Sequence, residues 1–355
     1  MMANLKSQIP NLKSLLAFGL LMLAVGSASA ATNTYLVVDL SGGVNAASYP
    51  VTYLSDVPAG GWTDEYKTTK LVLRKIPAGT FVMGSPTDEL GRKSDETQHQ
   101  VTLTKDFYIG VFEVTQRQFE LVKDQKPSYF NNVTYYAKRP VEQVSYYRIR
   151  EGFDSAISPN WPASNAVGAG SFMDKLRVKT GIPTFDLPTE SQWEYACRAG
   201  TTTALNSGNN LTSTTNDGNM AMVGRYFFNG GYGSTSSSML NLGTAPAGNY
   251  LPNQWGLYDM HGNVGEWCLD WYDGGYPGTV TDPVGAGFGS YRMIRGGWFE
   301  SSSGACRSAS PCASAPPRPA RTPASFSGAA PGIRPARACG RSTPLDFLRR
   351  PPTPQ

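Results

Sequence analysis

The stretch that most constrains the fold runs from residue 201 to residue 250. It consists largely of Asn, Gly, Ser and Thr with scattered aromatic residues. A loop of this length is uncommon in a compact domain unless it serves a purpose. The whole chain contains 38 glycines, 18 tyrosines and 7 tryptophans, while only 16% of its residues are charged. These proportions predict many turns and irregular loops fixed by aromatic side chains, and few long helices.

The first 30 residues have the features of a secretory signal peptide. Lys6 and Lys13 precede an apolar run at residues 15 to 25, and the small residues Ala28-Ser29-Ala30 follow it. The run is short for a membrane span, and no cysteine near the cleavage site could carry a lipid. We therefore expect an exported chain that begins at Ala31, periplasmic or extracellular, without a stable membrane span. An uncleaved anchor is the alternative.

The composition changes abruptly after Ser310. The remaining 45 residues hold 11 of the 26 prolines and seven arginines, with no lysine and one acidic residue. Such a sequence cannot form a packed core and predicts disorder. It is either a basic interaction tail or the product of a gene read out of frame. Because the tail carries the excess positive charge of a chain with net charge +4, we predict no nucleic-acid binding.

Short elements are predicted before the long loop. Apolar alternation indicates a strand, turn and strand within residues 31–67, a small N-terminal β arm, and four more strands between residues 70 and 114. Helices are predicted where a Ser or Thr can cap the first turn, in two cases with a Gln three residues later. They begin at Thr115 (with Gln118), after Ser145, at Ser171 (ending at Gly181) and at Thr189 (with Gln192).

Most catalytic signatures are missing from the sequence. The only histidines are His99 and His261, which excludes a multi-histidine metal site, and no phosphate-binding loop, nucleophile elbow or paired CxxC is present. Five cysteines in an oxidising compartment permit up to two disulfides, whose pairing the sequence does not determine. They are Cys197, Cys268, Cys306, Cys312 and Cys339.

Residues 187–200, LPTESQWEYACRAG, predict a buried helix. Trp193 and Cys197 lie four residues apart and therefore share one face, which we interpret as a core face. Glu194 and Arg198 have the spacing of a favourable ion pair on an adjacent face.

Residues 256–272, GLYDMHGNVGEWCLDWY, could bind a cation. Asp259, Asn263 and Glu266 supply hard oxygen atoms, and Gly262 and Gly265 let the backbone turn so that carbonyl groups can join them. Calcium takes six to eight such oxygens, whereas magnesium prefers a tighter octahedron. The alternative is an aromatic-rich turn whose acidic side chains cap backbone groups.

Residues 295–310, RGGWFESSSGACRSAS, predict a crowded backbone. Gly296-Gly297 indicates close approach of another segment, and Arg295 and Arg307 could bury their guanidinium groups against carbonyls or acids. Cys306 could be a reactive thiol, a disulfide partner or an inert core thiol.

These stretches together resemble the formylglycine-generating enzyme family, also called sulfatase-modifying factors, over residues 68–309. The resemblance implies a single compact α/β (α+β) domain of low regular secondary structure, related to C-type lectin folds and holding structural Ca²⁺. The motifs that carry it are IPAGTFVMGS (76–85), FEVTQRQF (112–119), RPVEQVSY (139–146), LPTESQWEYACRAG (187–200), GLYDMHGNVGEW (256–267) and RGGW (295–298).

The resemblance also implies site residues. One calcium site of the family would use the side chains of Asp259 and Glu266 and the carbonyls of Gly262 and Val264. For a second calcium site only Asn219, with the carbonyl of the residue that follows it, matches the family pattern.

The family's activity oxidises a sulfatase cysteine to formylglycine with O₂ and Cu(I), which two cysteine thiolates hold. Cys306 falls at the second copper position, but Ser301 falls at the first. A hydroxyl is a poor ligand for soft Cu(I), so copper binding is not expected.

Three functional hypotheses follow. The first is an exported, calcium-stabilised binding or divergent module that uses its long loops to bind a peptide, a sulfatase or a glycan. The second is a copper- and O₂-dependent oxidase with Cys306 as its surviving thiol. The third is a damaged gene product whose core lacks its last strand.

Overall fold

The computed structural model describes residues 33–152, 161–230, 243–272 and 278–314. They belong to one compact unit of mixed helices and strands. The predicted signal peptide (1–30) and residues 315–355 of the predicted tail lie outside the described residues. None of the described helices combines the length and apolar character that a membrane span requires.

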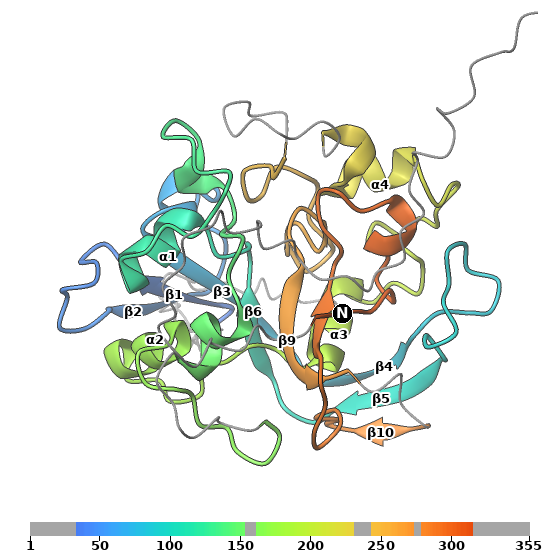
Figure 1. The fold of residues 1–355 in the computed structure, drawn as a ribbon, viewed down its shortest axis with the longest axis horizontal. Helices are drawn as coiled ribbons and strands as arrows, with labels where there is room; N and C mark the ends of the chain where they lie inside the picture. The colour runs from blue at the N-terminus through green and yellow to red at the C-terminus, as the bar shows by residue number, and fades with distance from the viewer. Residues whose placement is uncertain (1–32, 153–160, 231–242, 273–277, 315–355) are drawn as a thin grey trace, which may run out of the picture. The chain divides into compact units, whose positions relative to one another are not determined.

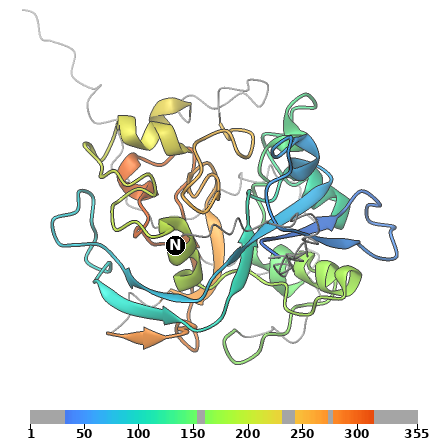
Figure 2. The same cartoon turned by 180° about the vertical axis from the view of Figure 1, so that it is seen from behind.

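The N-terminal strands form a four-stranded antiparallel sheet in the order β2-β1-β3-β6. Val38 in β1 and the neighbouring Leu40 are completely buried, so the predicted β arm forms but is an integral part of the domain rather than an appendage. Seen from behind in Figure 2, these blue strands lie on one side of the molecule and the orange C-terminal segments on the other. The strands are β1 (Tyr35–Asp39), β2 (Val51–Leu54), β3 (Lys70–Ile76) and β6 (Phe107–Gly110).

Two short helices pack against this sheet and share one apolar core with it. They are α1 (Gln116–Lys123) and α2 (Phe172–Thr180), and the rings of Phe119 and Phe172 stack with their centroids 5.4 Å apart. Both caps are as predicted, because Thr115 and Gln118 form a capping box and α2 ends at the left-handed Gly181. The helix predicted after Ser145 is a short π-helical segment at Tyr147–Glu151.

The C-terminal half surrounds α3 (Glu190–Arg198). Figure 1 shows this helix between β9 and the β4–β5 pair, and the contacts agree. Trp193 and Cys197 are fully buried, which confirms the predicted core helix and its Thr189–Gln192 capping box. The strands here are β4 (Gly79–Met83), β5 (His99–Leu103), β7 (Gly224–Arg225), β8 (His261–Gly262), β9 (Glu266–Trp271), β10 (Val280–Thr281), β11 (Arg292–Arg295) and β12 (Cys312–Ser314).

The ordered domain continues beyond its predicted end at residue 309. Strand β12 pairs antiparallel with β11, so that Ile294 lies opposite Cys312, and the sheet order is β12-β11-β9. Ser310 and Cys312 are buried. The beginning of the segment predicted as a disordered tail is therefore a strand, because β11 offers it an edge to pair with, and β11 has a neighbour on both sides.

Candidate functional site

The predicted cation-binding loop is a tight turn between β8 and β9. Asp259, Gly262 and Asn263 have φ values of 57°, 76° and 58°, so the backbone turns sharply in the left-handed region. The Gly262 N–H donates to the Gly296 carbonyl and the Asn263 N–H to the Arg225 carbonyl, each at 2.7 Å. The loop is thus fixed against β7 and against the end of β11.

The turn buries the two predicted acidic ligands. Asp259 is 2% exposed; its Oδ2 accepts a hydrogen bond from the Gly248 N–H, while its Oδ1 is buried without a hydrogen-bond partner. Glu266 Oε2 accepts a hydrogen bond of 2.7 Å from the Trp193 indole N–H. A buried carboxylate oxygen that lacks a donor is the kind of atom a hard cation would bind.

A third buried carboxylate, that of Glu113, adds to the negative charge. Burial raises the pKa of Asp259 to about 7, and burial together with Asp259 raises the pKa of Glu266 to about 7. Burial, then the charges of Asp259 and Glu266, raise the pKa of Glu113 well above its usual value. The positive charge of Lys67 lowers the pKa of Asp259, but by less than burial raises it. These oxygen donors, with their mutual repulsion, fit a bound calcium ion.

Four of the five residues predicted to bind calcium, Asp259, Gly262, Val264 and Glu266, follow one another closely on this segment of the chain. Asn219 lies instead in α4 (Gly218–Val223), where its side-chain amide donates to the Asn210 carbonyl at 2.9 Å. A second calcium site there remains a prediction. Among the described residues, no group of three or more His, Cys, Asp or Glu side chains is arranged to hold a metal ion.

The predicted copper segment follows β11. Ser301 is 5% exposed, and its hydroxyl accepts a hydrogen bond of 3.0 Å from the Trp298 N–H. Cys306, in the 3-10 turn η5 (Ser303–Cys306), is completely buried in an apolar cluster that includes Met220 and Tyr226. One thiol and one hydrogen-bonded hydroxyl do not fit the linear two-thiolate site that soft Cu(I) prefers.

Gly296 and Gly297 confirm the predicted close approach. A Cβ at residue 296 would lie 3.3 Å from the Trp193 ring, and one at residue 297 would lie 2.7 Å from Cys306 Sγ. Their φ values of 88° and 74° are also left-handed. The double glycine therefore lets β11 pass close to both α3 and the Cys306 turn.

His261, for which no sequence pattern predicts a role, is a buried structural residue. Its Nδ1 donates to the Cys306 carbonyl at 2.7 Å and its Nε2 accepts from the Asn206 N–H at 3.0 Å, which fixes the neutral tautomer. Burial lowers the pKa of His261 to about 4 and raises the pKa of Cys197, 3.9 Å away, to about 12. A thiol and an imidazole that both stay neutral do not form a nucleophilic pair.

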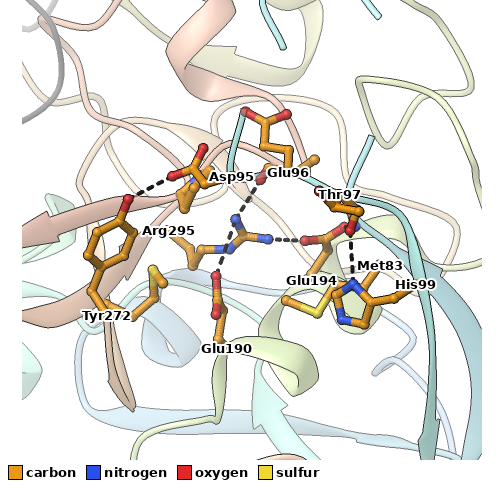
Figure 3. A pocket seen from close by; sticks show the side chains of 13 residues that line it. Met83, Asp95, Glu96, Thr97, His99, Glu190, Glu194, Tyr272 and Arg295 are labelled. Atoms are coloured by element: carbon orange, nitrogen blue, oxygen red, sulfur yellow. Dashed lines mark hydrogen bonds and ion pairs between the residues drawn. The ribbon is translucent and has the colours of Figure 1, made fainter. Parts of the chain in front are cut away.

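The two arginines of the same segment bind acids, as predicted. Arg295 contacts Glu194 and lies 3.7 Å from Glu190, while Arg307 contacts Glu96 at 2.7 Å. Figure 3 shows the small cavity beside Arg295, which both glutamates of α3 help to line. Its volume of about 30 Å³ suits a single water rather than an organic substrate.

The fold and these sites define a domain of the sulfatase-modifying-factor type. The family model of the sulfatase-modifying factor enzyme 1-like domain matches residues 63–323, well over half of the chain, and the chain belongs to this family. The matched residues begin after β1 and β2, although these two strands belong to the same sheet as β3 and β6.

Named relatives agree with this assignment. The chain is 29% identical over 259 residues to the formylglycine-generating enzyme of Thermomonospora curvata, covering 63% of this chain and 81% of the relative. It is 29% identical over 229 residues to the chaperone protein LppX of Paenibacillus barcinonensis, covering 59% and 75%. The solved structure of Treponema denticola variable protein 1 has a TM-score of 0.51 at 24% identity, covering 70% and 91%, and shows the fold alone.

Gly297 provides a test of the packing around Cys306. Alanine there would adopt a left-handed conformation and bring its Cβ to 2.9 Å from the Ala305 carbonyl as well as close to the sulfur. Left-handed strain costs about 1–2 kcal/mol and overpacking about 1–3 kcal/mol. We expect Gly297→Ala to lower the free energy of unfolding by about 2–4 kcal/mol in urea denaturation.

Gly208→Ala is the matched control. Gly208 has a φ of 84°, but a Cβ there would meet nothing within 4 Å, so only the backbone strain of about 1–2 kcal/mol should appear. If both variants lose the same free energy of unfolding, then residue 297 has room for a Cβ beside Cys306.

Proposed function

We propose that this chain is a calcium-stabilised binding module of its family that does not form formylglycine. The observation that carries the second half of the proposal concerns Ser301, which the family resemblance assigns to the first copper position and whose hydroxyl accepts a hydrogen bond from the Trp298 N–H. A hydroxyl at that position cannot replace the second thiolate that soft Cu(I) prefers. Without two cysteine thiolates, this segment would not hold Cu(I) in the way that the family's activity requires.

The buried carboxylates support the calcium half of the proposal. Asp259 and Glu266 would bind the ion through their side chains, and Gly262 and Val264 through their carbonyl oxygens. Calcium would supply positive charge beside these buried carboxylates and would bind the Asp259 oxygen that lacks a hydrogen-bond partner. The ion is therefore structural in this proposal and takes no part in chemistry.

Two groups of aromatic side chains, here together called the aromatic surface, support a role in binding. The Phe227 N–H donates to the Ser301 carbonyl at 2.9 Å. Tyr129 and Phe228 are 49% and 42% exposed. Exposed rings that are held by ring neighbours suit contact with an extended peptide or a glycan. The aromatic surface consists of Tyr129, Phe227, Phe228 and Phe299. Tyr129 and Phe299 each pack edge-to-face on the buried Phe130, and Phe227 packs edge-to-face on Phe228, with centroids 5.0–5.2 Å apart.

Removal of calcium tests the metal proposal. We expect EDTA to lower the melting temperature, because a ligand at a hundred times its Kd adds about 2.7 kcal/mol to the free energy of unfolding. Asp259→Asn should lose most of this calcium-dependent increment. Differential scanning calorimetry with calcium and with EDTA measures both.

Asp88→Asn is the control, since Asp88 is an exposed aspartate outside the loop; this variant should keep the full increment. If the unmodified chain melts at the same temperature in calcium and in EDTA, the calcium proposal is wrong.

A second experiment tests for the oxidase activity. The chain is incubated with Cu(I), O₂ and a cysteine-containing sulfatase peptide, and mass spectrometry follows the peptide. We expect no conversion to the aldehyde, and weak competition of the chain for Cu(I) against a chromogenic chelator. Ser301→Cys should raise the Cu(I) affinity at least tenfold, because it supplies a second soft ligand.

Ser303→Cys is the matched control: Ser303 is also buried and belongs to the same segment, but it is not the residue at the copper position. Conversion of the peptide by the unmodified chain would overturn the proposal and favour the oxidase. The same labelled peptide measures binding by fluorescence anisotropy, which Phe228→Ser should weaken if the aromatic surface is the binding face.

We also propose export, on the basis of the signal-peptide pattern in residues 1–30. Expression of the full chain in a bacterial host should place it outside the cytoplasm with Ala31 as its first residue. N-terminal sequencing of the fractionated protein checks this, and a cytoplasmic chain that retains its first residues would contradict it.

A further inference from the structure

Glu113 is far from the calcium loop in the sequence but bonded to it in the structure. It lies between β6 and α1 and is 8% exposed. Its Oε2 accepts a hydrogen bond of 2.6 Å from the Asn263 side-chain amide, and its Oε1 accepts one of 3.2 Å from the Val264 N–H. One carboxylate oxygen therefore holds the Asn263 side chain and the other holds the Val264 backbone.

Asn263 also forms hydrogen bonds with neighbouring segments of the chain. Its side chain donates to the Ala245 carbonyl at 3.3 Å and accepts from the Ala245 N–H at 2.8 Å. Its own N–H donates to the Arg225 carbonyl and its carbonyl accepts from the Phe299 N–H at 3.0 Å. With all its polar groups engaged, Asn263 keeps its left-handed conformation only while these partners stay in place.

These contacts determine where the neighbouring carbonyl points. In a trans peptide the C=O and the N–H project in opposite directions. Because the Asn263 N–H points at Arg225, the Gly262 carbonyl in the same peptide unit points away from β7. Glu113 then fixes the next peptide unit through the Val264 N–H. The Asn263–Val264 unit that Glu113 holds lies between the two peptide units that carry the Gly262 and Val264 carbonyls.

Glu113 would be an unfavourable choice if stability were its only role. A buried carboxylate close to Asp259 and Glu266 adds repulsion, and none of the ion pairs described involves it. A neutral acceptor would hold the Val264 N–H without that repulsion. The arrangement makes sense where a cation is bound beside it.

We propose, on the basis of the calcium binding proposed above, that Glu113 is a positioning residue for the calcium loop. It fixes the Asn263 side chain and the Asn263–Val264 peptide unit, and through them the two flanking units whose Gly262 and Val264 carbonyls would face the ion.

Three variants of Glu113 test this role by isothermal titration calorimetry with calcium. Glu113→Ala removes both acceptors and should weaken the affinity at least tenfold, the usual effect of losing a residue that orients metal ligands. Glu113→Gln keeps the length and one acceptor without the charge, whereas Glu113→Asp keeps the charge but is one methylene too short. Positioning predicts that the Gln variant binds more tightly than the Asp variant.

The opposite order, with the Asp variant close to the unmodified chain, would overturn the proposal and indicate that only charge matters. Equal affinity of all variants and the unmodified chain would also overturn it while leaving the calcium proposal intact. Failure of the unmodified chain itself to bind calcium would instead remove the calcium proposal and this inference with it.

Melting in EDTA separates positioning from a general structural role. Because Glu113 repels Asp259 and Glu266, Glu113→Gln should melt in EDTA at least as high as the unmodified chain, with a smaller increase on adding calcium. A lower melting temperature in EDTA with an unchanged increase would show a merely structural role and overturn the proposal.

Discussion

The buried ion pairs of Arg295 are the interaction on which the C-terminal half depends. This guanidinium is 1% exposed and contacts Glu194 of α3, while it also donates to the carbonyls of Ser308 and Ala309. Removing one partner of such a pair leaves an uncompensated buried charge, which costs about 3–5 kcal/mol. The helix of residues 187–200 and the RGG segment are therefore one physical unit, although almost a hundred residues separate them.

The same unit positions both candidate sites. Trp193 of α3 donates to Glu266 in the calcium loop, and its ring lies under Gly296. Gly297, the next residue, passes over the sulfur of Cys306. A shift of α3 would therefore disturb the cation loop and the thiol segment together.

Features that depend on nearby residues were predictable from the sequence. The capping boxes at Thr115 and Thr189 and the buried face of α3 each rest on spacings of three or four residues, and the structure has them. The contact between Glu113 and Asn263 spans 150 residues, and no local pattern marks it. Strand β12 was missed for a related reason: the composition of the tail says nothing of the open edge that β11 offers to Cys312 and its neighbours.

The pairing of Arg307 has a consequence for how the domain is assembled. Its partner Glu89 lies 218 residues earlier in the chain, and β12 completes its sheet only after that. Contacts between such distant residues form slowly, because a long loop must close before they contribute any stability. The sheet of β1, β2, β3 and β6 can form while the chain is still being made. The half that contains both candidate sites must wait for almost the last described residue, and until then its apolar surfaces are open to chaperones or to aggregation.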